Sequence, residues 1–187
     1  MAASRNADAT RARILSAATA EFAAHGLAGG RVDRIAAEAE ANVRMIYAYF
    51  GGKDALFDAA VAGAITDMAA AVPPVPGDLA GWAGRLFDFH ARQPSALRIN
   101  LWAQLERPAS ASEPLDAYLA KTNLVAAHAT IGIGAVDLLT IIYAVAQAWY
   151  LTPVGLLRSD GSDPDDHERL STHRDAVVLA VQRMISS

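Results

Sequence analysis

The 187-residue sequence contains no cysteine, which excludes disulfides and cysteine-based metal sites. It also lacks a glycine-rich phosphate-binding loop and a Gly-x-Ser-x-Gly nucleophile elbow, two short sequence motifs that are typical of enzymes. The first residues, MAASRNADATRAR, have no apolar signal-peptide core. We therefore expect a cytoplasmic protein that is not an enzyme and has no cofactor.

The histidines and acidic residues do not form a recognisable metal motif. None of the histidines makes an i,i+4 pair with another ligand of the H-E-x-x-H kind. The acidic run near residue 160 lacks EF-hand spacing. We expect no metal at these positions, which are His25, His90, His128, His167, His173, Asp160, Asp163, Asp165 and Asp166.

Strand-like alternation of polar and apolar residues is also missing over any useful length. The hydrophobic content is 53%, and much of it is alanine, a strong helix former. The formal net charge of −4 argues against a nonspecific binder of polyanions. It leaves room for one local DNA-reading face. An all-helical protein follows from this composition.

Residues 31–53, RVDRIAAEAEANVRMIYAYFGGK, indicate two short helices joined by a tight turn. Asn42 is a good N-cap for a helix over residues 43–50, which Gly51 and Gly52 end. At about 100° per residue, Ile46 and Phe50 share one face and are expected to enter a core with Ile35.

The opposite face of this helix carries Arg44, Met45 and Ala48, with Tyr47 and Tyr49 on its edges. Such a face suits a helix in the DNA major groove, where its middle reaches base edges and the phenol hydroxyls and Lys53 reach phosphates. Arg44 has two interpretations. Its guanidinium can read a guanine, or it can contact a phosphate or offset the nearby Glu40.

The segment RIAAEAEANVRMIYAYFGGKDALF resembles the helix-turn-helix of the tetracycline-repressor (TetR) family of bacterial regulators. The resemblance extends back through RARILSAATAEFAAHG and covers about the first 57 residues. This copy departs from the family pattern at the turn glycine, which is Glu40, at a second glycine, which is Arg44, and at a threonine, which is Arg31. A left-handed conformation at Glu40 costs roughly 1–2 kcal/mol.

The resemblance implies an all-α fold of about nine helices. A three-helix DNA-binding domain is expected over residues 1–53, and a larger ligand-binding and dimerisation domain over residues 54–187. The implied partners are double-stranded operator DNA, a small, mostly apolar effector and a second copy of the chain. The DNA-binding residues are predicted to be Arg31, Asn42, Val43, Arg44, Met45, Tyr47, Ala48, Tyr49 and Lys53.

Asp8 or Thr10 can cap the first helix, which is expected to end at His25-Gly26. Beyond the first module, helices are predicted over about residues 53–72, 78–93, 95–107, 113–130, 131–151 and from 164 onward, with Asp163 as the N-cap of the last one. The run over 131–151 reaches transmembrane length. It contains Asp137 and Gln147 and lacks Lys/Arg flanks, so we favour a helix buried on both sides, one of them by a dimer partner, and no membrane span. The predicted dimer interface is Leu138, Ile142, Val145, Trp149, Val177, Val181 and Met184.

Several aromatic and polar residues of the larger domain have two interpretations. Each one alone is best explained as ordinary helix core. Together they resemble the lining of the cavity that family members place between these helices, with few polar anchors among apolar groups. This predicted ligand site consists of Trp82, Phe89, His90, Arg98, Trp102, Tyr118, His128 and Tyr143, with Trp149 beside them.

Two functions of different class remain open from the sequence. The first is a ligand-responsive transcriptional regulator, most simply a homodimeric repressor. The second is a helical small-molecule-binding protein whose DNA-binding module has decayed, which Glu40 and the near balance of charges in the first 60 residues permit.

Overall fold

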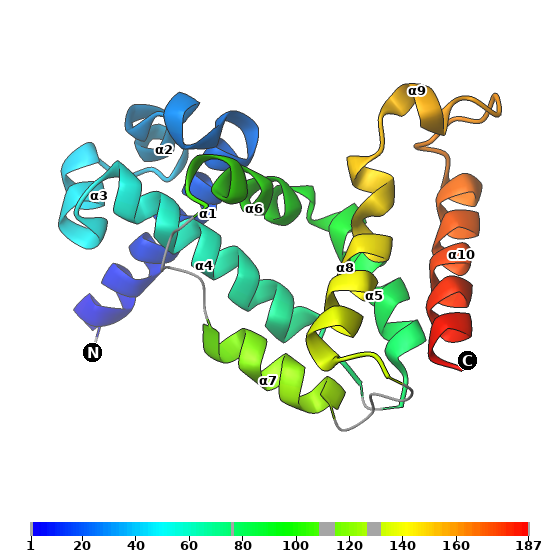
Figure 1. Cartoon of the computed structure of the whole chain (residues 1–187). Coiled ribbons are helices and arrows are strands. Elements are labelled where there is room, and N and C mark those ends of the chain that lie inside the picture. The colour runs from blue at the N-terminus through cyan, green and yellow to red at the C-terminus, as the bar shows by residue number, and fades with distance from the viewer. Residues whose placement is uncertain (1, 76, 109–114, 127–131, 187) are drawn as a thin grey trace. The chain divides into compact units, whose positions relative to one another are not determined.

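The computed structural model describes residues 2–75, 77–108, 115–126 and 132–186, and these residues form ten helices and no strand (Figure 1). The all-α prediction is confirmed. The helices are α1 (Ala2–Gly29), α2 (Val32–Glu38), α3 (Val43–Phe50), α4 (Lys53–Ala71), α5 (Leu79–Arg92), α6 (Pro94–Glu106), α7 (Leu115–Ala126), α8 (Ala135–Leu151), α9 (Val154–Leu157) and α10 (His167–Ile185).

The chain divides into two compact units that do not follow sequence order. The first unit consists of residues 1–69 and 93–114, and the second consists of residues 70–92 and 115–187. Helix α6 therefore belongs with α1 to α3 and most of α4, whereas α5 belongs with α7 to α10. The domain boundary expected near residue 54 stays a prediction.

The core of the first unit joins α1, α2, α3 and the first half of α4. Ile14, Ile35 and Ile46 are fully buried there. The rings of Phe22 and Phe57 meet edge to face, with centroids 5.1 Å apart. This aromatic pair fixes α4 against α1, because edge-to-face contact adds to the free energy of apolar burial.

Helix α1 breaks at Gly26, whose φ of 69° and ψ of −177° are not helical. The break leaves two backbone groups without their helical partners, and α6 supplies replacements for both. Arg98 Nε donates to the Ala23 carbonyl at 3.1 Å, and the Glu106 carboxylate accepts from the Leu27 N–H. Helix α6 thus packs along α1 and completes its hydrogen bonding.

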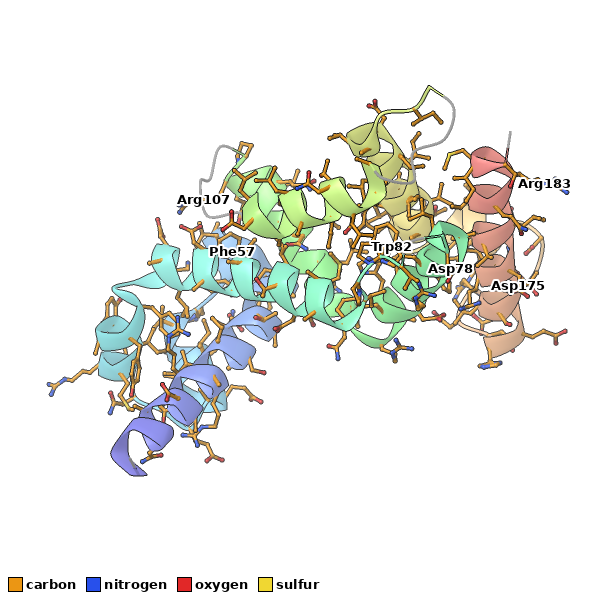
Figure 2. The ribbon with its side chains drawn as sticks, turned by 90° about the horizontal axis from the view of Figure 1, so that it is seen from below. Phe57, Asp78, Trp82, Arg107, Asp175 and Arg183 are labelled. Atoms are coloured by element: carbon orange, nitrogen blue, oxygen red, sulfur yellow. The ribbon has the colours of Figure 1, made fainter. Side chains whose placement is uncertain are left out.

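In the second unit, α5 packs against both α8 and α10 (Figure 1). Trp82 is fully buried in this unit, and its indole N–H donates to the Val72 carbonyl at 2.9 Å (Figure 2). Arg174 on α10 donates to Asp88 on α5 at 2.8 Å. No helix of the described ranges is both long and apolar enough to cross a bilayer.

The structure corrects two predicted helix starts and adds one helix. Asp8 and Thr10 do not cap α1, because its alanine-rich sequence continues the helix upstream to Ala2 and Thr10 donates to the Asn6 carbonyl within it. Asp166 caps α10 in place of Asp163 by accepting from the Glu168 and Arg169 N–H groups. The short α9 was not predicted.

Candidate functional site

Helix α3 is defined by a cap at each end. The Asn42 side chain accepts from the Met45 N–H at 2.9 Å, and the Asn42 backbone is extended. Gly51 adopts a left-handed conformation with a φ of 85°, and its N–H donates to the Tyr47 carbonyl. Both caps were predicted, and both are confirmed. They confine the helix to residues 43–50.

The two faces of α3 differ largely as their spacing predicted, but Phe50, which was expected in the core, and Met45, which was expected on the exposed face, are both half-buried. Ile46 is fully buried, whereas Arg44 and Ala48 are exposed and Tyr47 keeps 53% of its surface accessible. Asn42 and Val43 are exposed at the start of the helix, and Met45 and Tyr49 are half-buried at its edges. The helix therefore presents one cationic, small-residue face with a tyrosine hydroxyl beside it.

The remaining predicted DNA-binding residues flank α3 and already have partners in the free chain. Lys53 Nζ donates to the Ala28 carbonyl at 3.2 Å. Arg31 is exposed and pairs with Asp33 at 3.3 Å. Glu40 adopts the predicted left-handed conformation, with a φ of 49°. Arg44 and Glu40, both in the described part of the chain, form no ion pair with each other.

Two arginines near the start of α1 connect it to α2 and α3, a role that the sequence did not reveal. Arg13 Nε donates to the Ala39 carbonyl at the end of α2, at 3.2 Å. The guanidinium of Arg11 lies 5.0 Å from the centre of the Phe50 ring at the end of α3. Both contacts are made between helices that only the tertiary fold brings together.

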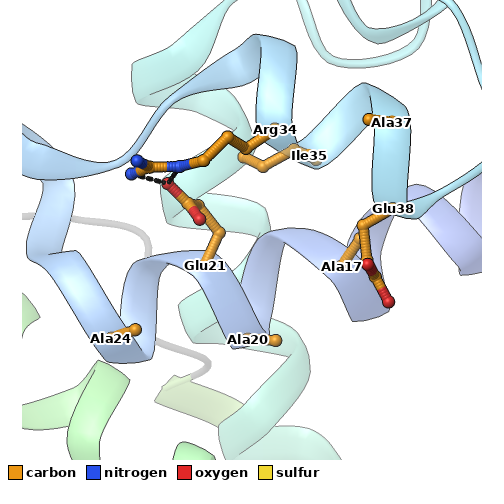
Figure 3. A pocket seen from close by; sticks show the side chains of 8 residues that line it. All are labelled: Ala17, Ala20, Glu21, Ala24, Arg34, Ile35, Ala37 and Glu38. Carbon is orange, nitrogen blue, oxygen red and sulfur yellow. Dashed lines mark hydrogen bonds and ion pairs between the residues drawn. The ribbon is translucent and has the colours of Figure 1, made fainter.

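A groove of about 580 Å³ lies between α1 and α2 (Figure 3). Alanine side chains make up much of its lining, and Arg34 Nε donates to Glu21 at 2.8 Å within it. Partial burial raises the pKa of Glu21, but hydrogen bonds from the Arg34 side chain and the Arg31 N–H outweigh it and lower the pKa overall. The charges of this pair neutralise each other, so the groove offers a ligand few free polar groups.

The predicted ligand-site residues separate into the two units. Trp82, Phe89 and His90 on α5, Tyr118 on α7 and Tyr143 on α8 belong to the second unit. Arg98 and Trp102 belong to the first unit, where Arg98 bonds to Ala23 and Trp102 packs against Gly26. His128 lies outside the described residues. The assignment of these residues to a ligand site stays a prediction.

The second unit contains two buried polar groups among these aromatic rings. Lys121, which was not among the predicted site residues, is 5% exposed, and its Nζ donates to the Tyr143 hydroxyl at 2.7 Å. Burial lowers the pKa of Lys121. Lys121 lies one helical turn before the buried Val125, so a cation on the apolar stripe of α7 was the signal in the sequence.

His90 is the second buried polar group, with 1% of its surface exposed. Burial lowers its pKa to about 4. The Gln147 amide nitrogen lies 3.4 Å from Nε2, and Nδ1 has no hydrogen-bond partner within the described ranges. The neutral ring therefore accepts from Gln147 at Nε2 and retains an unused polar atom in an apolar interior.

The predicted dimer-interface residues lie mostly inside one protomer. Within the single chain Leu138, Ile142, Trp149, Val177 and Val181 are buried, and Val145 and Met184 are half-buried. Other apolar side chains of α8 and α10 are exposed: Val136, Ile141, Leu151 and Leu179. The assignment of the seven residues to an interface is not tested by the single chain.

Among the described residues there is no group of three or more histidine or carboxylate side chains placed to hold a metal ion. The features that remain are the exposed face of α3 and the buried polar groups of the second unit.

Comparison with known proteins identifies two families of domain in this chain. Residues 14–60 match the bacterial regulatory proteins of the tetR family, and residues 78–183 match the tetracyclin repressor-like C-terminal domain. The second match alone covers more than half of the chain.

Individual relatives agree with these matches. The HTH-type transcriptional repressor SCO4008 of Streptomyces coelicolor is 51% identical over 104 residues, which are 56% of this chain and 54% of that protein. The HTH-type transcriptional repressor NicS of Pseudomonas putida is 49% identical over 53 residues, 28% of this chain and 25% of that protein. The matched region thus spans about half the length of the first curated relative and a quarter of the second.

Similarity to a solved structure extends over nearly the whole chain. The crystal structure of SCO4942 from Streptomyces coelicolor superimposes with a TM-score of 0.79 at 36% identity, covering 94% of this chain and 97% of that one. With an α3 capped and exposed as a helix-turn-helix reading helix requires, and both domain types matched, the chain belongs to the TetR family of bacterial transcriptional regulators.

Proposed function

We propose that this protein is a homodimeric transcriptional repressor that binds operator DNA through α3 and leaves it when a small effector binds the second unit. The observation that supports this most is the outward face of α3, where Arg44 and Tyr47 are exposed while Ile46 on the opposite side is fully buried. The side chains of that face are exposed among the described residues, and they suit contact with bases and phosphates.

In this proposal each protomer places α3 in one major groove. Arg44 reads a base edge, because its fork of donors matches the O6 and N7 atoms of guanine. Tyr47 and Lys53 contact phosphates at the rim and fix the register. A dimer with two reading helices requires half-sites about one helical turn apart.

Effector release requires a link between the two units, and α4 provides a covalent one. The helix begins at Lys53, directly after the reading helix, and ends at Ala71, beyond the point where the first unit stops. A shift of α4 on effector binding would move α3. Such coupling is typically about 1–3 kcal/mol, enough to release DNA bound near its working affinity.

A mobility-shift assay with the DNA upstream of the gene tests the proposal, and a shuffled sequence of the same composition serves as the control. Specific binding is expected from the wild-type protein. Tyr47→Phe and Lys53→Ala are expected to weaken all sequences about equally, and the lysine change to reduce the salt dependence by roughly one ion. Arg158→Ala removes an exposed cation from the second unit and is expected to change neither.

A folded, dimeric protein that shifts neither DNA would contradict the proposal. It would instead favour the alternative of a small-molecule-binding protein whose DNA-binding module has decayed. The strained turn at Glu40 would then be part of that decayed module.

A further inference from the structure

The second unit buries a lysine without a carboxylate to neutralise it. Lys121 on α7 is 5% exposed, and its ammonium group donates to the uncharged Tyr143 hydroxyl, 2.7 Å away. Across the described ranges of the chain, no carboxylate lies within ion-pair distance of its ammonium group. An unpaired buried cation costs several kcal/mol, and an anion bound beside it would offset that cost.

The contacts of Lys121 leave hydrogen-bond donors unused. An ammonium group has three donors, and the Tyr143 hydroxyl uses one of them. The same ammonium lies 5.4 Å from the centre of the Tyr143 ring, and this ring meets Trp82 edge to face with centroids 5.6 Å apart. One charged group from α7 therefore lies over a pair of aromatic rings contributed by α5 and α8.

A second buried polar group, His90 on α5, lies beside Gln147 on α8 in the same unit. Gln147 is one turn beyond Tyr143 on α8, and its amide nitrogen lies 3.4 Å from His90 Nε2. The buried Nδ1 of His90 has no hydrogen-bond partner among the described residues. Because Nε2 accepts from Gln147, Nδ1 carries the proton, so it is a donor that a ligand can use one turn of α8 beyond Tyr143.

We propose that Lys121, with Tyr143, binds the anionic group of the effector, which is an apolar molecule carrying a carboxylate. The aromatic rings of Tyr143 and Trp82 contact its apolar body. This inference rests on the proposed effector response and specifies the charge of the effector. Anionic compounds are expected to bind, whereas neutral or cationic compounds of the same shape are not. The competing explanation is a lysine that serves only as a structural donor to Tyr143.

Matched probes separate the two explanations. Thermal unfolding of the wild-type protein is measured with 2-naphthoate, its neutral amide 2-naphthamide and the cation 2-naphthylmethylammonium. Benzoate and decanoate are tested beside their amides to cover smaller and longer bodies. At least one acid is expected to raise the midpoint by several degrees more than its amide, because binding to the folded state alone stabilises it. If no acid exceeds its amide, the proposal is overturned.

Variants then assign the effect to Lys121. Lys121→Met is expected to weaken binding of the effective acid about tenfold or more, measured by calorimetry, and to raise the unfolding midpoint of the ligand-free protein, because it removes an uncompensated buried charge. Asn123→Met, on the exposed side of the same helix, is the matched control and is expected to keep the acid affinity. Unchanged acid binding by Lys121→Met would also overturn the proposal.

DNA affinity without any probe is measured on the same proteins. Lys121→Met is expected to retain wild-type DNA binding. If the protein binds DNA but shows no preference for acids, only the proposal that the effector is anionic is refuted. If the protein prefers acids but does not bind DNA, only the proposed repressor function is refuted.

Discussion

Glu40 holds strain in the turn of the helix-turn-helix. Its φ of 49° makes it the one non-glycine residue with a positive φ in the described part of the chain. The left-handed conformation brings Cβ close to the following carbonyl, which costs roughly 1–2 kcal/mol, and the exposed side chain regains nothing by packing. The strain was predictable because the family pattern that this segment resembles has glycine at this position of the turn.

Replacing Glu40 with glycine is therefore expected to stabilise the protein. The free energy of unfolding should rise by about 1 kcal/mol in urea titrations, because relief of the strain exceeds the added flexibility of the unfolded chain. Ala41→Gly, whose φ is not positive, is the control and should lower the same quantity. A Glu40→Gly protein no more stable than wild type would show that the turn stores no strain.

His90 makes stability depend on acid pH. Burial lowers its pKa from 6.5 to about 4, so the unfolded chain binds this proton more readily than the folded one. The free energy of unfolding is expected to fall as pH drops from about 6.5 to 4, by about 2 kcal/mol between pH 7 and pH 5. The contribution is complete above pH 6.5.

Chemical unfolding of wild type and His90→Gln at pH 7 and pH 5 measures this contribution. Burial also lowers the pKa of His173, which contributes to the pH sensitivity of both proteins. The difference in pH sensitivity between wild type and His90→Gln therefore isolates the contribution of His90. Equal pH sensitivity in the two proteins would mean that the pKa of His90 is the same in the folded and unfolded states, contrary to this account.

Residues whose roles are local were predictable, and those with distant partners were not. Asn42 and Gly51 cap α3 through atoms within four positions of themselves, so their residue types were sufficient. Arg13 bonds to Ala39, and Lys121 bonds to Tyr143, each across more than twenty positions. Residue type alone assigned Arg98 to a ligand site, whereas the structure shows it bonded to the Ala23 carbonyl.

At the scale of elements, the pairing of α1 with α6 depends on Gly26. Its position is close to Trp102, and a Cβ there would come within 2.8 Å of the indole ring. The break in α1 at this glycine is also what frees the Leu27 N–H for Glu106 on α6. One residue therefore sets both the packing distance and the hydrogen bonds between the two helices.

Gly26→Ala is expected to destabilise the protein by about 2–4 kcal/mol, because it adds a steric clash to a strained left-handed conformation. Gly29→Ala is the matched control, since its Cβ would meet the His25 Cβ at an ordinary 3.4 Å and its φ is not positive. Thermal or urea unfolding gives both values. Similar losses in the two variants would refute the specific role of Gly26.

Sequence patterns predicted the presence of the helices more accurately than the residues at which the helices begin and end. Residues 43–50 and the helix beginning at Lys53 match the structure, because caps and glycines mark those boundaries. The start of α10 was misplaced by three residues, since Asp163 and Asp166 are both good caps and only the fold selects between them. The four-residue α9 is too short to show a periodic pattern.

At the scale of the whole molecule, exposed apolar side chains on α8 and α10 support a dimer. Ile141 on α8 is 37% exposed and Leu179 on α10 is 47% exposed in the single chain. Surfaces of this kind commonly mark protein interfaces. Val181, at 1% exposure, belongs to the core of the protomer, so a charge there would disturb folding before assembly.

Light scattering at low micromolar concentration is expected to report a dimer for the wild-type protein. Leu179→Asp should shift it to a monomer that keeps its helical circular dichroism and loses DNA binding, because two reading helices must act together. Leu105→Asp places the same charge at a more exposed apolar residue of α6 and should leave the dimer intact. A stable wild-type monomer would contradict the assembly.

The most direct test of the account is a binding-site selection from random double-stranded DNA with the wild-type protein and Arg44→Ala. The wild type is expected to enrich a palindrome with half-sites about 10–10.5 base pairs apart. Arg44→Ala should lose preference at one position of each half-site and keep the rest, since a bidentate contact to guanine discriminates by about 1–3 kcal/mol. Identical motifs from both proteins would remove Arg44 from base reading, and the absence of any enriched motif from a folded wild-type dimer would contradict DNA recognition through α3.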